Sequence, residues 1–222
     1  MHRTRTLAFA ALLAPFAFPC LAAPFVNLDF EQATIVPHDP DFGLLDWELA
    51  VPGWGHNTGT PAADVVYYGF PHLGYDQLYL LTDTEHDEVP LSLEGRFSLW
   101  VQGGLTEEFG NAFITQTGDI PSGTRSIRLL ANWNAFEPRV FLDGAEIPLH
   151  GTLLPGFQVI YVGDVTARAG TTAELKIAYD IGEGGIVDSI LFSPFPVPEP
   201  SAIMLAAFGL VGLAACRWRP KR

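Results

Sequence analysis

The sequence predicts an all-β fold, an antiparallel β-sandwich of the jelly-roll type, on three observations. Residues 24–196 contain no long stretch of helical periodicity. Short runs rich in β-branched and aromatic residues recur there, separated by clusters of Gly, Pro, Asn and Asp that favour turns. About eleven such runs fall within these residues, which is typical of two packed sheets rather than of a helical or α/β domain.

Some of these runs alternate apolar and polar residues, most clearly over 97–101 and 175–179, as strands with one buried face do. Asp143-Gly144 lies between two apolar runs and predicts a tight hairpin, because this dipeptide accepts positive φ angles. Ile120-Pro121-Ser122-Gly123 predicts a second turn. The expected strands are 25–30, 65–68, 77–81, 97–102, 112–116, 126–130, 139–142, 146–149, 158–162, 173–179 and 186–192.

The region between the two ends of the chain is strongly acidic. It carries six basic and twenty-four acidic residues, a net charge of about −18. A field of that sign repels phosphate backbones, which argues against nucleic acid as a partner and leaves cations and neutral ligands open. Both cysteines, Cys20 and Cys216, lie in terminal apolar runs, so this region has no disulfide framework and no thiolate metal site.

Residues 1–22 have the three parts of a secretory signal peptide: a basic start, an apolar run over 7–18 and small residues at the expected cleavage site. We expect cleavage after residue 22 or 23, the earlier bond being preferred. The alternative is a buried N-terminal helix, which Pro15 and Pro19 disfavour because proline breaks helices. The β-sandwich is then expected to span 23–193.

The C-terminal end predicts a membrane anchor. A proline-rich spacer over 194–201 precedes an apolar segment, 202–216, and a basic tail, 217–222. The apolar segment is short for a hydrocarbon layer of about 30 Å, but its flanking Ser, Cys and Trp can lie at the interface and its arginines can reach out of it. The positive-inside rule places the tail in the cytoplasm and the body outside. A core helix that closes the domain is the soluble alternative.

Val197-Pro198-Glu199-Pro200, followed by an apolar segment and an arginine-rich end, resembles the PEP-CTERM sorting signal. The resemblance covers residues 197–222. It implies recognition by an exosortase-type sorting enzyme, cleavage near Pro-Glu-Pro, and delivery to the envelope or the exopolysaccharide matrix. It also implies that Glu199 and its two prolines serve recognition and not catalysis.

The body is similar to galactose-binding-like jelly rolls, a fold of many carbohydrate-binding modules. Short motifs spread over the body carry the resemblance: Asn27-Leu28-Asp29-Phe30-Glu31, Pro52-Gly53-Trp54, Gln116-Thr117-Gly118, Val140-Phe141-Leu142-Asp143-Gly144, residues 163–170, and Val187-Asp188-Ser189-Ile190. In similar modules, an acidic residue after the first strand and an aspartate before the last one share a structural calcium ion. The matching residues here are Glu31 and Asp188, and Asp29 would contribute a further oxygen because calcium needs several. Solvated acids at strand ends are the alternative.

Sugar binding is the second expected chemistry. The apolar C–H face of a sugar stacks on aromatic rings while amides and carboxylates bind its hydroxyls. Trp133, flanked by Asn132 and Asn134, is the most ligand-like group, and Trp54 and Tyr68 are further candidates. The alternative is that these aromatic side chains fill the core.

No catalytic motif is present, so we expect a protein that is not an enzyme. Glu107 and Glu108 are adjacent and would point to opposite faces of a strand, the six histidines do not form a zinc motif, and no Gly-x-Ser-x-Gly sequence occurs. Three hypotheses remain: a carbohydrate-binding surface component, a purely structural matrix protein, and a glycan-active hydrolase that uses two carboxylates from distant residues.

Overall fold

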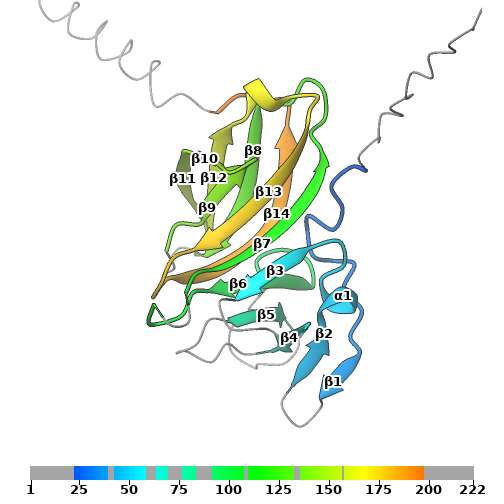
Figure 1. Cartoon of the computed structure of the whole chain (residues 1–222). Coiled ribbons are helices and arrows are strands. Elements are labelled where there is room, and N and C mark those ends of the chain that lie inside the picture. The colour runs from blue at the N-terminus through cyan, green and yellow to red at the C-terminus, as the bar shows by residue number, and fades with distance from the viewer. Residues whose placement is uncertain are drawn as a thin grey trace, which may run out of the picture.

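Two β-sheets pack as a sandwich in the computed structural model of the chain (Figure 1). The structure describes residues 23–39, 43–58, 64–69, 77–83, 92–107, 110–132, 136–156 and 158–197. The predicted signal peptide, the Pro198-Glu199-Pro200 part of the sorting motif and the predicted membrane segment 202–216 lie outside these residues. Within them, no helix is long and apolar enough to cross a membrane.

The larger sheet has nine strands in the order β1-β2-β4-β5-β6-β14-β8-β12-β11. Its strand pairs are antiparallel except for the parallel pair β4 and β5. The bounds are Pro37–Asp39 (β1), Leu44–Asp46 (β2), Val65–Tyr68 (β4), Gln77–Thr82 (β5), Phe97–Gln102 (β6), Ser126–Asn132 (β8), Leu149–Leu154 (β11), Gln158–Asp164 (β12) and Gly184–Ser193 (β14).

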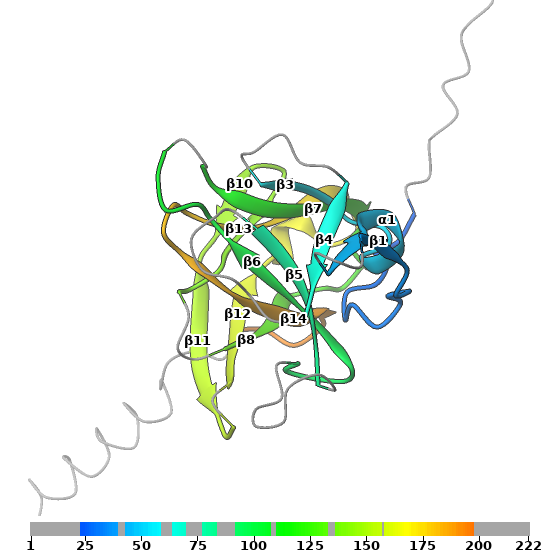
Figure 2. The ribbon, with the colours of Figure 1, turned by 90° about the horizontal axis from the view of Figure 1, so that it is seen from below.

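The smaller sheet has five antiparallel strands in the order β10-β9-β13-β7-β3. Seen from below in Figure 2, β10, β3, β7 and β13 lie on one side of the sandwich and β14, β12 and β8 on the other. Two short helices, α1 (Trp47–Ala50) and the 3₁₀ turn η1 (Thr166–Arg168), lie in connections. The strand bounds are Gly55–Thr58 (β3), Ala112–Asp119 (β7), Arg139–Leu142 (β9), Ala145–Ile147 (β10) and Thr172–Tyr179 (β13).

The structure confirms the predicted all-β sandwich and most of its strands. The alternating runs form β6 and β13, and Asp143 and Gly144, with φ angles of 49° and 74°, form the predicted hairpin turn between β9 and β10. The expected strand over 25–30 is wrong. Asn27 and Phe30 have φ angles of 50° and 58°, a left-handed conformation that a strand does not allow, and the chain turns there instead.

The core lies between the two sheets and continues under α1. Its fully buried side chains come from both layers, for example Leu99 of β6 and Ile114 and Leu175 of the smaller sheet. Trp47 and Trp54 extend it toward the N-terminal segment. The indole of Trp47 donates to the carbonyl of Trp54 at 2.6 Å, so both large rings are buried with their polar atoms paired.

The side-chain amide of Gln116, on β7, links the N-terminal segment to the smaller sheet by hydrogen bonds. Its oxygen accepts a hydrogen bond from the Val26 N–H at 2.7 Å, and its nitrogen donates to the carbonyls of Val26 and Gly53 at 3.1 and 2.8 Å. A buried amide thus replaces the backbone pairing that a strand at 25–30 would have made.

Candidate functional site

On the outer face of the smaller sheet, the strand register places side chains of β9, β13 and β7 side by side in rows across the strands. Lys176 of β13 lies opposite Phe141 of β9 on one side and Thr115 of β7 on the other. In the next row, Ala178 lies between Arg139 and Phe113. Because strand residues alternate between faces, these side chains share the solvent side of the sheet while their neighbours fill the core. The burial pattern agrees, since Ile114, Val140 and Ile177 between them are fully buried.

A hollow of about 330 Å³ lies on this face, and we call it the sheet hollow. Small Ala178, only 5 % exposed, lies between larger side chains in its row and leaves the space open. Aromatic, amide and charged side chains surround this space, a mixture that suits a ligand with both apolar and polar faces. The lining residues are Asn57, Gly110, Asn111, Phe113, Arg139, Phe141, Lys176, Ala178 and Asp180.

Lys176 lies between two phenyl rings in this hollow. Its ammonium nitrogen is 4.6 Å from the centroid of Phe113 and 4.9 Å from that of Phe141, both within cation–π range. Lys176 forms no ion pair with any acidic residue that the structure describes. The two rings therefore position a positive charge that no described carboxylate pairs with.

Arg139 forms one wall of the sheet hollow and is held by two carboxylates. Its guanidinium donates to both oxygens of Asp180 at 2.9 Å and to both oxygens of Glu146 at 2.9 Å. The hydrogen bond from Arg139 lowers the pKa of Glu146, and the two carboxylates raise the pKa of Arg139. The four hydrogen bonds fix the planar guanidinium across the strands.

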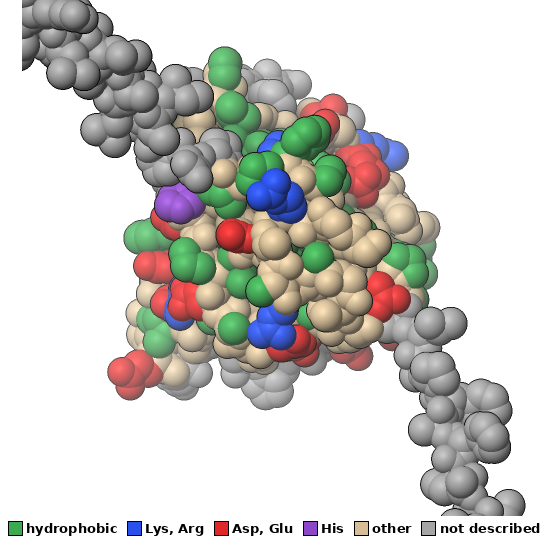
Figure 3. Space-filling model, turned by 90° about the horizontal axis from the view of Figure 1, so that it is seen from above, with side chains coloured by type: hydrophobic (Ala, Val, Ile, Leu, Met, Phe, Trp, Pro, Cys, Tyr) green, Lys and Arg blue, Asp and Glu red, His purple; other side chains and the backbone are tan. Residues whose placement is uncertain are grey.

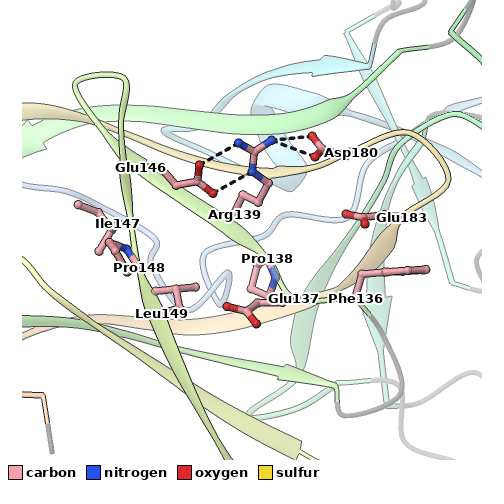
Figure 4. Close-up of a pocket in the computed structure, with 10 residues that line it drawn as sticks. All are labelled: Phe136, Glu137, Pro138, Arg139, Glu146, Ile147, Pro148, Leu149, Asp180 and Glu183. Atoms are coloured by element: carbon pink, nitrogen blue, oxygen red, sulfur yellow. Dashed lines mark hydrogen bonds and ion pairs between the residues drawn. The ribbon is translucent and has the colours of Figure 1, made fainter. Parts of the chain in front are cut away.

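A second and larger hollow, about 680 Å³, lies on the other side of this wall, and we call it the edge hollow (Figure 4). Arg139, Glu146 and Asp180 belong to its lining, and Figure 4 shows the guanidinium between the two carboxylates. Four acidic side chains and one arginine make it net negative. The remaining lining residues are Phe136, Glu137, Pro138, Ile147, Pro148, Leu149 and Glu183.

Acidic side chains are dispersed over the face of the body that Figure 3 shows. On the face shown in Figure 3 they alternate with apolar and polar side chains and do not gather into a single patch. The sheet hollow differs locally, because it is lined by Lys176 and Arg139 against one carboxylate, Asp180. Its lining side chains therefore sum to one positive charge on a strongly negative protein, while Glu146, which is bound to the same arginine, lies just outside the lining.

Glu31 and Asp188 lie near each other at the larger sheet, beside the loop that leads into β6. Asp188 lies on β14 and is fully buried; its Oδ2 accepts from Ser98 Oγ at 2.6 Å and from the Glu94 N–H at 3.0 Å. Glu31 is exposed, and its Oε1 accepts from the N–H groups of Arg96 and Phe97 at 2.7 and 2.9 Å. Both carboxylates thus hold the loop that leads into β6.

Burial, with a smaller contribution from the nearby Glu31 carboxylate, raises the pKa of Asp188 to about 7, against the hydrogen bonds from Ser98 and the backbone, which lower it. Asp29 does not join this pair through its Oδ1, which accepts from the Glu31 N–H at 3.3 Å in a local turn. Among the described residues, no group of three or more His, Cys, Asp or Glu is arranged to hold a metal ion.

Of the residues predicted for sugar binding, Trp54, Tyr68 and Asn132 are described by the structure, and these three do not line one site. Trp54 is 4 % exposed, and its indole donates to the Asn27 carbonyl at 3.0 Å, so it is a core residue and not open to a ligand. Asn132 accepts from the Ile186 N–H at 2.7 Å at the end of β8, while half-buried Tyr68 packs against the core on β4. Trp133 and Asn134 lie outside the described residues.

Sequence reasoning missed the side chains that line the two hollows. Phe113, Phe141 and Lys176 come from three separate strands, and only strand pairing makes them neighbours. One sequence pattern did indicate this face. The strand 139–142 alternates, with Arg139 and Phe141 on the solvent side and Val140 and Leu142 in the core. A search for aromatic residues on the solvent side of predicted strands would have found Phe113 and Phe141.

Comparison with solved structures gives remote likenesses. A Stig cyclase from Fischerella sp. TAU is 12 % identical with a TM-score of 0.46, over 77 % of this chain and 95 % of that one. An apo cyclase from Fischerella sp. is 14 % identical with a TM-score of 0.47, over 77 % and 94 %. A β-glucosidase from Kluyveromyces marxianus is 13 % identical with a TM-score of 0.27, over 61 % and 19 %.

No curated protein matches the chain. A family model does match its C-terminal end. Residues 196–219 match the model of the PEP-CTERM protein-sorting motif. This confirms the predicted sorting signal, which indicates an exported protein with an exosortase-type enzyme as its processing partner.

Proposed function

We propose that this protein is a non-catalytic, carbohydrate-binding component of the cell envelope or exopolysaccharide matrix, and that the sheet hollow is its glycan site. The sorting motif supports the location, with residues 202–216 as the membrane anchor and the sandwich outside. We also propose a galactose-binding-like jelly roll for the sandwich. The observation that carries the binding role is the combination of two phenyl rings, two amides and a fixed ion pair around one open space.

Each part of the sheet hollow matches one part of a sugar. Phe113 and Phe141 are half-buried and present apolar surface to the C–H face of a pyranose. Asn57 and Asn111 are exposed and offer both donors and acceptors to hydroxyl groups. The Arg139–Asp180 ion pair needs no rearrangement before binding, which reduces the ordering cost.

Filling the sheet hollow tests this role. Replacing Ala178 with leucine adds three carbons in the open space and should abolish retardation of the full-length chain, purified in detergent, in polysaccharide-containing gels. The fold should persist because the new side chain enters existing space and displaces no packed atoms. Thr117→Leu, on the same outer face of the sheet but on β7 and outside the hollow, is the matched control and should bind like wild type. Undiminished binding by Ala178→Leu would place the glycan site elsewhere, and a chain that no polysaccharide retards would favour a structural role.

We further propose a structural calcium ion at Glu31 and Asp188, with Asp29 nearby. A buried carboxylate beside a second carboxylate is costly without a cation, and Glu31 Oε2 accepts no hydrogen bond from the described residues. Backbone carbonyls would have to complete the six to eight oxygen ligands that calcium takes. These oxygens fit the ion chemically, although Asp188 already accepts hydrogen bonds through both of its own.

Thermal unfolding with and without chelator tests the calcium site. Calcium in excess of its dissociation constant should raise the unfolding midpoint by several degrees, since an ion bound only to the folded state stabilises it by about 2.7 kcal/mol at a hundredfold excess. Glu31→Gln should remove the calcium effect, and Glu174→Gln, an exposed acid on the smaller sheet, should keep it. An identical midpoint in chelator and in millimolar calcium would eliminate the site.

A further inference from the structure

We infer that the sheet hollow selects a monoanionic sugar, a residue that carries one carboxylate or one sulfate ester, and that Lys176 reads the negative charge. This inference rests on the proposed glycan-binding function and specifies its ligand. Lys176 is partly buried, and its ammonium group lies between the rings of Phe113 and Phe141 without an acidic partner among the described residues.

Lys176 is held in place by its surroundings, as a ligand-recognition group is, whereas a solvated surface lysine is free to move. The two rings fix where the ammonium group lies, which reduces the rotamer entropy lost on binding. The same rings offer the stacking surface for a pyranose, so a substituent on the sugar ring would reach the nitrogen while the ring rests on the aromatic face. Asn111 and Asn57 can donate to the remaining oxygens of a carboxylate or sulfate.

The charges around the sheet hollow indicate one negative charge on the ligand. Arg139 is paired with Asp180 in the lining and with Glu146 just outside it, a group with one net negative charge, so Lys176 supplies the one positive charge of the lining that no described carboxylate pairs with. A dianionic phosphate would meet a single cation on a body with many acidic residues. The single charge of a monoanion matches the single ammonium group of Lys176. Repulsion between this ligand and distant exposed acids of the protein is largely screened beyond about 8 Å at physiological ionic strength.

A comparison of polymers that share a sugar backbone tests the inference. The full-length chain, purified in detergent, would be run in affinity gels that contain polygalacturonate, a sulfated galactan or neutral galactan. We expect stronger retardation by at least one anionic polymer than by neutral galactan. Polygalacturonate alone would assign the charge to a carboxylate, and the sulfated galactan alone would assign it to a sulfate ester.

Lys176→Met keeps the aliphatic stem between the rings and removes the charge. It should weaken binding of the preferred anionic polymer about tenfold, the size of one charge-assisted hydrogen bond, with little change for neutral galactan. Arg125→Met is the charge control, since this exposed arginine lies outside the hollow and its loss changes the net charge equally. Thermal unfolding of each variant checks that the fold is retained.

Two results would overturn the inference and separate it from the proposed function. Binding of neutral galactan as strong as that of both anionic polymers, abolished by Ala178→Leu, would leave the glycan site in place and reject the charge selection. Equal losses in Lys176→Met and Arg125→Met would show a general effect of net charge. A wild-type chain that no polymer retards would reject both the inference and the glycan-binding function.

Discussion

Replacing Asp188 with alanine is expected to lower the free energy of unfolding by about 3 kcal/mol at pH 5. The carboxylate of this fully buried residue accepts hydrogen bonds from Ser98 Oγ, the Glu94 N–H and the Ser189 N–H. Alanine would leave these donors without partners in a place that water does not reach. Chemical denaturation followed by tryptophan fluorescence measures the difference.

The stability of the wild-type protein should also fall as pH rises from about 4 to about 7 in the absence of a bound cation. Burial raises the pKa of Asp188 to about 7 in the folded state from 3.8, so the folded protein binds more protons than the unfolded chain between these values. Stability decreases with pH wherever the folded state holds more protons, and a shift of this size corresponds to at most roughly 4 kcal/mol. For the same reason, Asp188→Ala should cost less at pH 8 than at pH 5.

Asp188→Asn separates the hydrogen bonds from the charge, because it keeps the shape and an acceptor oxygen but cannot ionise. Its stability should be nearly constant between pH 4 and 7 apart from changes common to all variants. Asp164→Ala is the matched control: Asp164 is exposed, and the Thr166 hydroxyl lowers its pKa, so its removal should alter stability little. A wild-type profile that rises with pH over this window in chelator would contradict the assigned environment of Asp188, and a flat profile only in calcium would support the proposed ion.

Replacing Trp54 with alanine should cost about 3–5 kcal/mol, which is the range for large-to-small changes at buried aromatic positions. The ring packs against Phe30, with centroids 5.8 Å apart, and its indole N–H bonds the Asn27 carbonyl at 3.0 Å. Trp54→Phe keeps most of the packing and loses one hydrogen bond to the Asn27 carbonyl, which still accepts from the Phe30 N–H at 3.3 Å, so it should cost only about 1 kcal/mol. Urea denaturation monitored by circular dichroism distinguishes the two.

Trp100 provides the comparison for Trp54. It lies on β6, is partly exposed and donates to Gln102 Oε1 at 3.1 Å, so Trp100→Ala should cost clearly less than Trp54→Ala. Trp54→Ala is also expected to leave glycan binding intact wherever the protein remains folded. If Trp54→Ala is as stable as wild type but loses glycan binding, the ring serves a ligand and not the core.

Strong local patterns allowed most of the fold to be predicted from the sequence. Alternation over 97–101 and 175–179 identifies β6 and β13, and Asp143-Gly144 identifies the hairpin between β9 and β10. The sequence does not predict β1, β2 and β3, which have only three or four residues and depend on their pairing partners, and the expected strand 146–149 joins the end of β10 to the start of β11, whose residues 150–154 are not predicted. The apolar run 25–30 was misassigned, because its tertiary contacts through Gln116 and Trp54 stabilise a turn.

The candidate site was less predictable, and the reason is physical. The sheet hollow depends on the register that places Lys176 beside Phe141 and Thr115, and register is not readable from one sequence. Tryptophan content pointed to Trp54, whose large apolar surface made it a core residue instead. The pair Glu31 and Asp188 was found through similarity to a family, and the structure places both at the loop that precedes β6.

Hydrogen–deuterium exchange of the full-length chain with and without a polysaccharide that retards it in gels tests the central claim most directly. If the outer face of the smaller sheet is the glycan site, protection should concentrate in β7, β9 and β13, around Phe113, Phe141 and Lys176. Backbone amides of β4, β5 and β6 in the larger sheet should exchange at unchanged rates. Protection confined to the larger sheet would contradict the assignment.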